Sequence, residues 1–596
     1  MATLIFDIET DGLLDTMTTI HCIGIKDAET GQATAYNGDR IQTAIDRLCS
    51  ADCIVGHNII GFDIPAIINR YPEFKPQGVV RDTLVLSRLF WPHIKDKDYE
   101  RENFPGKLIG SHSLKAWGYR LGEYKDEAPG FDVWSEELEA YMMQDVEVNY
   151  HLWEVCQKQS LKWDVPMTVR AFSGNDCVEL EHQVAEICSD VERHGICFDS
   201  QRAINLTAKL TKRKAELTKE LTKIFPTKEI RTPFTPKVNN KKRGYVKGVP
   251  TEKVTYQEFN PASRQQVAER LREIGWEPKE YSPSGHPKVD ETVLSSLKFP
   301  EAAALNEYFL LTKRLGQISD GNQAWLRLAK GERIHGRIHS GGTHTGRMSH
   351  SNPNIAQVPS NRAPYGEECR ACFIPDKGHV MVDADADALE LRCLAAYMSY
   401  YDGGAYIKTV LEGNKEDGTD LHTLNAKAIG CDRDTAKVFF YGLIYGAGVA
   451  KLGEILGGGP AKGKAAKANL MRALPALNKL IEACQKKVKT RGYLVGLDGR
   501  RLVPRSEGAA LNTLLQSAGA LIMKRALVIF VEEYLTKGSH IVGIIHDEFL
   551  CTVPKEDAQE TGENLVTSIR RAGEFYRFKC PLDAQYQVGA NWSEIH

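Results

Sequence analysis

The pattern of apolar and polar residues near the end of the chain predicts a β-hairpin with acids at its bend. Apolar residues fill 541–544 and 549–551, and the segment between them contains Asp547 and Glu548. Ionised carboxylates beside buried strands are costly unless a positive charge balances them. Because oxygen ligands hold hard divalent cations, the pattern indicates a metal site that a further acid elsewhere completes.

A second strand pattern supplies candidates for that acid. The apolar residues 380–382 lead into Asp383, Asp385 and Asp387, which recur at period two. Residues at this spacing share one face of a strand, so spacing alone does not say which aspartate binds a metal. The alternative is a solvated acidic edge strand, because runs of charge usually lie at the surface.

Between the two acidic segments, the sequence predicts a helix with a mixed stripe of side chains. The stripe consists of residues at four-residue steps: Arg433, Lys437, Tyr441 and Tyr445. Side chains at this spacing line one side of a helix. Two cations followed by two aromatic rings suit a triphosphate joined to a sugar and a base. An ordinary amphipathic helix with cations extended toward solvent is the alternative.

The first residues of the chain predict a strand that also carries acids. Asp7 and Glu9 are two residues apart, so they face the same side of that strand. Asp63 follows further along the chain, and Tyr141 and Asp145 are four residues apart on one face of a predicted helix. Acids at these spacings are common, so each piece alone is weak support for a site.

Composition describes an ordinary soluble protein. The chain has 596 residues, 42% hydrophobic and 26% charged, a length that predicts about three to five domain-sized units. We find no apolar run near the ~20 residues that span a bilayer, and no basic leader followed by an apolar stretch, so we expect neither a membrane partner nor a secretory signal. The 14 scattered cysteines favour reduced thiols and a cytoplasmic location.

Charge is segregated along the chain. The net charge of −2 argues against a uniformly basic DNA-binding protein. Basic residues are concentrated at about 207–255, including Lys241-Lys242-Arg243 and Lys247. Such a segment neutralises nucleic-acid phosphates and makes affinity fall with salt. A flexible, solvated loop is equally compatible with this composition.

Together these motifs resemble those of the family A DNA polymerases, and in particular the replicative polymerases of T-seven-like phages. The resemblance covers nearly the whole chain and weakens at about 225–255. Further stretches that carry it are 82–89, 116–123, 389–395 and 511–520. It implies a multidomain α/β fold, with a ribonuclease H-like DEDD exonuclease domain followed by a right-hand polymerase of palm, fingers and thumb. The implied activity is template-directed transfer of dNMP to a primer 3′-hydroxyl, with release of pyrophosphate and 3′–5′ proofreading.

For the polymerase site, the resemblance resolves the choice among the three aspartates. In the family pattern the metal-binding Asp lies five residues before a Glu, so Glu390 points to Asp385. Asp385 and Asp547 would hold two Mg²⁺ ions, with Mn²⁺ as a substitute and the main chain of Ala386 assisting. Asp387 departs from the family, which usually has Ser there.

The resemblance also assigns contacts to the incoming dNTP. Lys437 is a candidate general acid toward pyrophosphate, and a positioned acid typically contributes ~10²–10⁴-fold in rate. Glu390 is implied as the steric gate against a ribose 2′-hydroxyl. The other implied contacts are His422 and Arg433 at the triphosphate, Tyr441 under the sugar and Tyr445 near the templating base.

Contacts to the primer terminus are implied as well. The residues that resemble minor-groove readers are Arg347, Asn512 and Gln516, with His546 as a neighbour of the terminus. Minor-groove acceptors occupy equivalent places in every correct base pair, so such contacts check the shape of the pair without reading sequence.

At the N-terminal end, the acids resemble the DEDD type of 3′–5′ exonuclease that has Tyr before its last Asp. The implied ligands of two further Mg²⁺ ions are Asp7, Glu9, Asp63 and Asp145. Tyr141 would orient the attacking water. All four carboxylates are present, so we expect an active proofreading site. The alternative is a vestigial domain kept for DNA binding.

The expected domain order follows the resemblance. We expect the exonuclease domain at 1–155 and the thumb at 165–335, with a long helix at about 201–225 and a short basic loop at about 226–257. The palm is expected in two parts, 336–397 and 512–596, with the fingers at 398–511 between them. The sequence Gly457-Gly458-Gly459-Pro460 predicts a break inside the fingers. We expect no segment before the exonuclease, which favours a replicative role over gap repair.

The implied partners are primer–template DNA and dNTPs. A phage helicase-primase and a single-strand-binding protein are further candidates in the host cytoplasm. The best-known members of this subfamily carry a long thumb insertion that captures host thioredoxin as a processivity clamp. Because the equivalent stretch here, about 226–257, is much shorter, we expect weak or no dependence on thioredoxin.

Three other classes of protein match parts of the pattern. A single-subunit RNA polymerase shares the palm and a similar helix, but Glu390 and the exonuclease acids argue against it. A catalytically inactive DNA-binding subunit would not need intact acids at both sites. The third class is a nuclease whose C-terminal half only positions DNA, which primer extension with Asp547→Ala would test.

Overall fold

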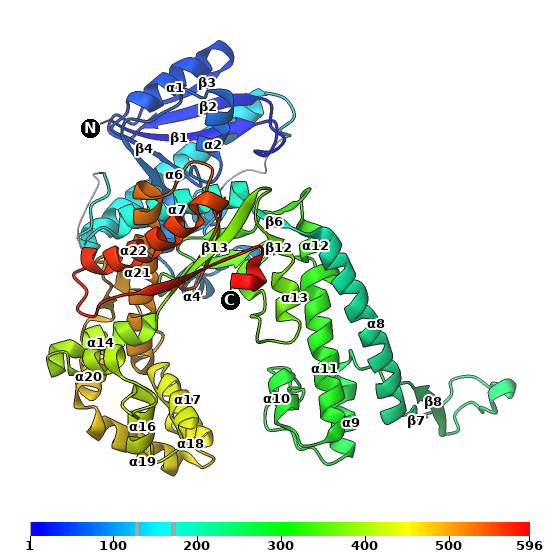
Figure 1. The fold of residues 1–596 in the computed structure, drawn as a ribbon. Helices are drawn as coiled ribbons and strands as arrows, with labels where there is room; N and C mark the ends of the chain where they lie inside the picture. The colour runs from blue at the N-terminus through cyan, green and yellow to red at the C-terminus, as the bar shows by residue number, and fades with distance from the viewer. Residues whose placement is uncertain (1, 125–129, 169–174, 596) are drawn as a thin grey trace. The chain divides into compact units, whose positions relative to one another are not determined.

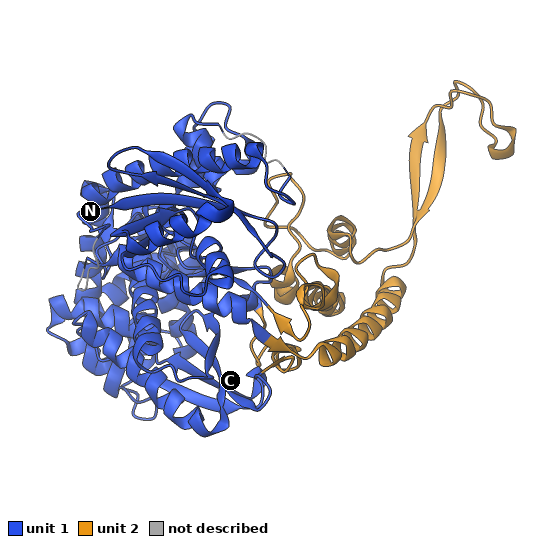
Figure 2. Ribbon diagram, turned by 90° about the horizontal axis from the view of Figure 1, so that it is seen from above, with its two compact units in different colours: residues 1–196, 335–357, 375–596 blue, residues 197–334, 358–374 orange. Residues whose placement is uncertain are grey.

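The computed structural model describes residues 2–124, 130–168 and 175–595 of the chain. They form two compact units, which Figure 1 shows by chain position and Figure 2 by colour. Unit 1 comprises 1–196, 335–357 and 375–596, and unit 2 comprises 197–334 and 358–374. All 14 cysteines are free thiols, as the sequence predicts.

The N-terminal part of unit 1 is a five-stranded mixed sheet with helices packed against it (Figure 1). The strand order is β3-β2-β1-β4-β5, and β1 runs antiparallel to β2 and parallel to β4. Alternate residues of β1 enter different cores: Ile5 packs with α6, whereas Phe6 and Ile8 pack with α1. The strands are β1 (Thr3–Thr10), β2 (Ile20–Asp27), β3 (Ala33–Asn37), β4 (Cys53–Gly56) and β5 (Val79–Asp82), and the helices are α1 (Ile41–Ser50), α2 (Asp63–Arg70), α3 (Thr83–Phe90), α4 (Ile94–Tyr99), α5 (Leu114–Leu121) and α6 (Glu136–Trp163).

The second sheet of unit 1 is antiparallel, with the order β16-β17-β13-β18. The predicted hairpin is confirmed, because β16 (His540–Ile545) turns directly into β17 (Glu548–Pro554). The predicted strand before it in sequence is β13 (His379–Ala386), which pairs with β17 and with β18 (Ala584–Gly589). Further elements of this part are α7 (Cys177–His194), β10 (Arg337–His339), β11 (Ser349–Ser351), α21 (Ala510–Glu533) and α22 (Ala558–Phe575).

The long helix α21 lies in the core of unit 1. By length and composition the segment Glu507–Glu533 could cross a membrane, but 89% of its most apolar window is buried within the protein. Lys524 and Arg525 interrupt this segment, so it does not form a continuous apolar run in the sequence. Both cations are buried in ion pairs, with Glu181 and Asp176 respectively. The helix is therefore a core helix with internally neutralised charges.

Helices dominate the segment between β13 and α21. The predicted break at Gly457–Pro460 is confirmed, because it separates α18 from α19 and Pro460 occupies the first turn of α19. Proline is favoured there because the first helical N–H needs no partner within the helix. The elements are α14 (Leu389–Asp402), α15 (Ala405–Glu412), α16 (Leu421–Ile429), α17 (Arg433–Ile444), α18 (Val449–Ile455), α19 (Pro460–Ala473), α20 (Pro475–Arg491), β14 (Leu494–Val495) and β15 (Arg501–Leu502).

Unit 2 is built around two long helices. The predicted helix at 201–225 is α8 (Ser200–Ile224), which packs against α11 (Pro300–Leu315). A small sheet has the order β12-β6-β9. The remaining elements are β6 (Ile196–Phe198), α9 (Arg264–Glu273), α10 (Glu291–Ser296), α12 (Trp325–Leu328), β9 (Arg333–Ile334), α13 (Gly366–Arg370) and β12 (Phe373–Ile374).

The basic stretch at 226–257 differs from its expected form. It is not a loop but a two-stranded ribbon, made of β7 (Lys228–Phe234) and β8 (Thr251–Gln257). Both segments contain β-branched and aromatic residues, which favour strands. The high content of Lys, Pro and Gly between them hid this local preference in the sequence.

Candidate active sites

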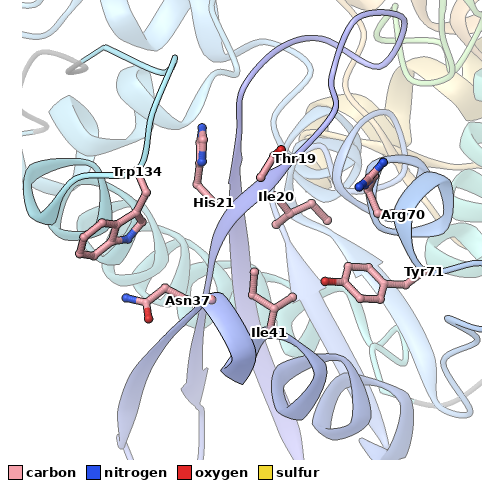
Figure 3. Close-up of a pocket in the computed structure, with 9 residues that line it drawn as sticks. Thr19, Ile20, His21, Asn37, Ile41, Arg70, Tyr71 and Trp134 are labelled. Atoms are coloured by element: carbon pink, nitrogen blue, oxygen red, sulfur yellow. The ribbon is translucent and has the colours of Figure 1, made fainter.

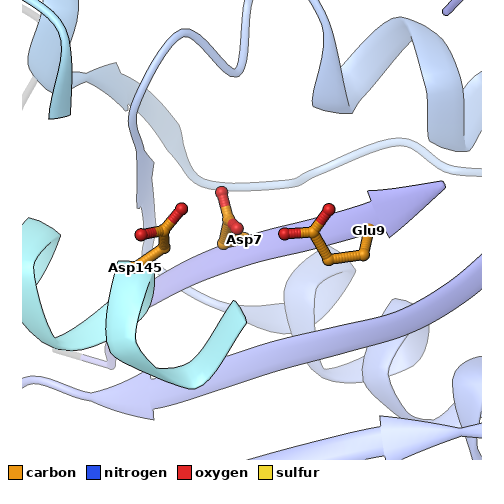
Figure 4. A group of neighbouring side chains, drawn as sticks. All are labelled: Asp7, Glu9 and Asp145. Atoms are coloured by element: carbon orange, nitrogen blue, oxygen red, sulfur yellow. The ribbon is translucent and has the colours of Figure 1, made fainter. Parts of the chain in front are cut away.

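The first candidate site lies where β1 meets α6 (Figure 4). Asp7 and Glu9 point from β1 toward Asp145 on α6. One ligand oxygen from each of the three carboxylates lies within 4.8 Å of the others. Carboxylates this close repel one another when ionised, and an oxygen-binding cation relieves the repulsion. The geometry therefore fits a divalent metal site, and Tyr141 lies one helical turn before Asp145 as the spacing predicts.

Asp63 is close to these acids but is held differently. It is the first residue of α2, and its side chain is 4% exposed. Burial, followed by the charge of Asp82, raises the pKa of Asp63 to about 8, and Glu9 adds to the shift. The N–H of Ile8 on β1 hydrogen-bonds the same carboxyl. Asp63 thus lies within electrostatic reach of Glu9, although the group of three closely spaced acids does not include it.

Asp82 is a functional candidate that the sequence analysis did not single out. Its carboxylate accepts hydrogen bonds from the N–H groups of Asn58 at 2.8 Å, Ile60 at 3.1 Å and Leu84 at 2.8 Å. It therefore caps α3 and holds the loop that leads to Asp63. Burial raises the pKa of Asp82. The signal in the sequence is an Asp directly before an apolar helical run, the usual place of an N-cap.

A pocket of about 530 Å³ lies at the edge of the same sheet (Figure 3). Its lining includes Arg70, Tyr71 and Trp134, and the Trp134 side chain is 44% exposed. Ile20 in the pocket pairs with Thr10, the residue after Glu9. The pocket is not lined by Asp7, Glu9, Asp63 or Asp145. The candidate site is therefore defined by the geometry of these acids and not by the pocket.

The second candidate site lies where the end of β13 meets the turn between β16 and β17. The N–H of Ala386 donates to the carbonyl of Asp547 at 3.1 Å, which places the turn beside the strand end. Asp385 lies directly opposite Glu548 in the strand register, and side chains in such a pair project to the same face. The structure therefore brings Asp385, Asp547 and Glu548 together, although they are far apart in sequence.

The three aspartates of the predicted strand have different environments. β13 ends at Ala386, so Asp387 lies beyond it and the expectation that all three share one strand face is wrong. Asp387 is 3.9 Å from the Arg392 guanidinium. Asp383 is 3% exposed and accepts a hydrogen bond from the N–H of Gln587 at 3.1 Å. Asp385 is the exposed member of the set.

The two acids of the hairpin turn are also held differently. Burial raises the pKa of Asp547, the charge of Glu390 adds to the shift, and the Asp547 N–H and the charges of His546 and Arg347 oppose it. Glu548 is 5% exposed and accepts a hydrogen bond from the Trp592 indole N–H at 3.2 Å. A carboxylate that burial makes costly to ionise gains from a bound cation, so Asp547 suits a metal ligand.

Glu390 connects three parts of this site. One carboxylate oxygen accepts a hydrogen bond from the Arg347 guanidinium at 3.0 Å, and the other accepts one from the Tyr445 hydroxyl at 2.6 Å. Burial, followed by the hydrogen bond to Glu390, raises the pKa of Tyr445. These contacts join the loop before β11, the start of α14 and the end of α17.

The predicted stripe on α17 is confirmed. Phe439 and Phe440 are fully buried on one side of the helix, whereas the four stripe residues are half-buried or exposed. The ring of Tyr441 lies 6.0 Å from that of His422 and 6.1 Å from that of Tyr445. The stripe therefore forms one accessible surface that begins with cations and ends with aromatic rings.

His422 belongs to the cationic end of this surface. Burial and then the charges of Arg433 and Lys437 lower the pKa of His422, while the charges of Asp420 and Asp434 oppose the shift. Arg433 donates a hydrogen bond to Asp420 at 3.0 Å. Asp420 caps α16 by accepting the N–H of His422 at 3.1 Å. Asp420, which the sequence analysis passed over, therefore orients both the cation and the histidine.

Asn512 and Gln516 lie one turn apart near the start of α21. They are half-exposed, whereas most neighbouring positions of this helix are buried. His546 is exposed at the hairpin turn, with a left-handed φ of 57°. Among the described residues, no hydrogen bond or ion pair joins these three side chains to the Arg347–Glu390–Tyr445 cluster.

Comparisons with known proteins identify the family and the fold of the chain. The model of DNA polymerase family A matches residues 240–594 of the chain. The chain is 35% identical to the DNA-directed DNA polymerases of Escherichia phage T7 and Enterobacteria phage T3, with 100% of this chain and of each relative covered. The alignment extends over 711 positions, so more than a hundred positions of the relatives have no counterpart here. A thermostable DNA polymerase I of Thermus filiformis is 30% identical, with 44% of this chain and 32% of the relative covered.

The fold comparison covers nearly all of the chain. The POL domain of Pol1 from M. smegmatis, solved in complex with DNA primer-template and dNTP, superposes with a TM-score of 0.75 at 17% identity. The match includes 99% of this chain and 96% of that chain. This likeness shows the fold, and the full-length sequence identity to the phage enzymes shows the family. The chain belongs to DNA polymerase family A.

Proposed function

We propose that unit 1 carries two separate phosphoryl-transfer sites, one for DNA synthesis at β13 and one for 3′–5′ proofreading at β1. The chain is a template-directed DNA polymerase of the phage type, as its family and its full-length likeness to the T7 and T3 enzymes indicate. One observation carries the residue assignment. The Ala386 N–H donates a hydrogen bond to the Asp547 carbonyl, which places Asp547 beside the strand end that contains Asp385.

Family A DNA polymerases depend on metal ions, and we propose two Mg²⁺ ions at each site, with Mn²⁺ as a substitute. The close spacing of three carboxylates at β1 and the burial of Asp547 at β13 fit such ions. When bound, the ions would activate the attacking hydroxyl or water and neutralise charge on the phosphates. The proposed ligands are Asp385, Asp547 and the main chain of Ala386 for synthesis, and Asp7, Glu9, Asp63 and Asp145 for proofreading.

The α17 surface supports binding of the incoming nucleotide. Arg433, Lys437 and His422 would contact the triphosphate, with Tyr441 under the sugar and Tyr445 near the templating base. Lys437 is exposed and has no ion pair with any described residue, which leaves its ammonium free to protonate the leaving pyrophosphate. A positioned acid of this kind contributes typically ~10²–10⁴-fold in rate.

Glu390 is the proposed steric gate against ribonucleotides. Its carboxylate is fixed from both sides by Arg347 and Tyr445, so its stem has little freedom to move aside for a 2′-hydroxyl. Arg347 with Asn512 and Gln516 would read the minor groove at the primer terminus, and His546 would lie beside that terminus. Tyr141 would orient the water of the proofreading reaction.

We also propose the domain assignment. Residues 1–155 would form the ribonuclease H-like DEDD exonuclease domain, and the sheet order with acids on β1 and α6 supports this. The thumb would be 165–335, of which residues 197–334 lie in unit 2. The palm would be 336–397 and 512–596, with the fingers at 398–511. A helicase-primase and a single-strand-binding protein in the host cytoplasm remain proposed partners.

Primer extension tests the synthesis site. We expect Asp547→Asn and Asp385→Asn to lose at least about a hundredfold in extension rate, because each removes a charge that the ions need. Asp387→Asn is the matched control, since Asp387 lies beyond β13, and it should extend primers normally. Normal extension by Asp547→Asn would overturn the assignment and favour a protein whose C-terminal half only positions DNA.

Degradation of a 3′-labelled single strand tests the proofreading site. The double variant Asp7→Ala with Glu9→Ala should degrade the strand at least about a hundredfold more slowly and still extend primers, because the two sites use different ligands. Glu137→Gln is the matched control, since Glu137 is exposed on the same helix as Asp145. Unchanged degradation by the double variant would contradict the proposal.

A further inference from the structure

Unit 2 contains a ribbon that neither proposed site uses. β7 pairs with β8 in continuous antiparallel register, from Lys228 opposite Gln257 to Phe234 opposite Thr251, and the two strands form a sheet of their own. Most side chains on both strands are exposed. Figure 2 shows the ribbon extending from the helices of unit 2. A two-stranded hairpin alone is marginally stable in water, so an extended one invites a functional explanation.

The tip of the ribbon, residues 235–250, has a shape of its own. Asn240 and Tyr245 form a β-bridge, and the Asn240 carboxamide accepts a hydrogen bond from the N–H of Arg243 at 3.2 Å. Gly244 has a φ of 70°, which favours glycine at this turn. The rings of Phe234 and Tyr245 meet edge to face at 5.0 Å. The tip therefore presents its side chains from a folded turn.

Positive charge is concentrated at this tip. Residues 235–250 contain no Asp or Glu, although the whole chain has a net charge of −2. Along the strands of the ribbon, Arg231 pairs with Glu229 and Glu252. No ion pair with any described residue involves the cations of the tip, which are Lys237, Lys241, Lys242, Arg243 and Lys247.

Apolar side chains are exposed beside these cations. Val238 is 70% exposed, Val246 is 56% exposed and Val249 is 52% exposed. A ribbon that served only solubility would gain nothing from exposed valines, and apolar groups gathered within a polar rim mark interaction sites. Cations next to apolar groups match the nucleic-acid backbone, in which phosphates alternate with sugars.

We propose that the β7–β8 ribbon is an arm that binds the backbone of duplex DNA, with the cations of its tip on phosphates and without reading sequence. A two-stranded ribbon has the width that the major groove of B-DNA admits. An acidic protein is the competing occupant, but DNA is the polyanion that this enzyme handles in its reaction. The proposal rests on the conclusion that the chain works on DNA, not on which residues catalyse.

Salt dependence of DNA binding tests the arm in the full chain. Each phosphate contact contributes about 0.9 to the slope of log affinity against log salt for B-DNA. One variant replaces three cations of the tip by Gln: Lys241→Gln, Lys242→Gln and Arg243→Gln. The magnitude of its slope should therefore be smaller than that of the wild type by about 2–3, and it should bind DNA about 10–100-fold more weakly at about 0.1 M salt. Binding is measured by fluorescence anisotropy of a primer–template in EDTA, where no nuclease acts.

The matched control removes the same charge elsewhere. Lys486, Lys487 and Lys489 are exposed cations clustered on α20, and their replacement by Gln should change the slope by less than about one unit. A second variant, Lys237→Gln with Lys247→Gln, covers the rest of the tip and should lose about two contacts. Equal losses in the tip and α20 variants would mean a net-charge effect and would overturn the proposal.

Two measurements of primer extension distinguish a role of the arm in DNA binding from a role in the chemical step. Single-nucleotide addition at saturating DNA should be unchanged in the tip variants, whereas the number of nucleotides added per binding event should fall. An arm for an acidic protein would leave the DNA slope and the product length unchanged, and that result also overturns the proposal. Failure of the wild-type chain to extend any primer would refute the synthesis site, while the anisotropy result would still decide the role of the ribbon.

Discussion

Glu181 is a buried acid whose charge is balanced by neighbouring cations. Its side chain is 1% exposed, accepts a hydrogen bond from Arg500 at 2.7 Å and pairs with Lys524. Burial alone raises the pKa of Glu181, but the charges of Lys524 and Arg500 outweigh it and hold the pKa at about 2. Arg500 also lies against Gly346, where an added Cβ would be 2.6 Å from its guanidinium. The network therefore supports the loop that presents Arg347.

We predict that Glu181→Gln lowers the free energy of unfolding by about 3–5 kcal/mol at pH 7, because it leaves the buried Lys524 without its acid and leaves Arg500 with Asp498 alone. The folded pKa is below the usual 4.5, so this stability is present above pH 4.5 and is lost as the pH falls toward 2. The difference between variant and wild type should therefore shrink with acid.

Urea denaturation between pH 3 and pH 7 measures this effect. Asp190→Asn on the same helix is the control, since Asp190 pairs with Arg193 but is 70% exposed, and exposed pairs contribute less than about 1 kcal/mol. A Glu181→Gln protein as stable as the control at pH 7 would contradict the prediction.

Among the elements, α18 and α19 show how glycine sets the distance between helices. A Cβ on Gly463 would lie 2.1 Å from the carbonyl oxygen of Val449 and 2.5 Å from the main-chain nitrogen of Gly453. These atoms are main chain, so they cannot move aside as a flexible side chain would. The two helices, joined by Gly457–Pro460, are close because position 463 has no side chain.

We predict that Gly463→Ala destabilises the protein by about 1–3 kcal/mol, as overpacking usually does. Gly448→Ala is the matched control, because a Cβ there meets nothing within 4 Å and the backbone φ of −68° suits alanine. Thermal denaturation compares the two variants, with primer extension as a second readout. If Gly463→Ala has the same melting temperature as the control, the close approach of the helices does not constrain this position.

For the whole molecule, the shortness of the chain relative to its phage relatives bears on processivity. More than a hundred positions of the T7 and T3 polymerases have no counterpart here. The stretch whose shortness led us to expect weak thioredoxin dependence forms the β7–β8 ribbon, which is exposed and basic at its tip. A thin ribbon offers little apolar surface for a stable protein interface, since such interfaces bury about 800 Å² per partner.

We therefore predict that reduced thioredoxin changes the length of primer-extension products less than about twofold, because the ribbon lacks the area of a stable interface. The measurement uses a long, singly primed template with excess unlabelled trap DNA, and serum albumin at equal concentration as the control. Products many times longer with thioredoxin than with albumin would show that the ribbon captures this partner after all.

Local patterns in the sequence sufficed for the elements that carry the candidate site residues. Period-two acids located β1 and β13, and four-residue steps located the stripe of α17, because strand and helix periodicity are properties of a few neighbouring residues. The hairpin at Asp547 and the break before Pro460 were likewise predictable. The β7–β8 ribbon was not predicted, because the Lys, Pro and Gly residues of this stretch masked its two short strands. The family followed from the order of the motifs and not from any one of them.

Only the tertiary structure decided which of these acids meet. Asp145 faces Asp7 and Glu9 across the packing of α6 on β1, and the sheet register sets Asp385 opposite Glu548. Glu181 finds Arg500 across 319 positions of sequence. These contacts depend on burial and on the pairing of distant strands, which no local period encodes. The sequence by itself determined the elements and the chemistry they carry, and the packing of distant elements decided which carboxylates share a site and which are neutralised in the core.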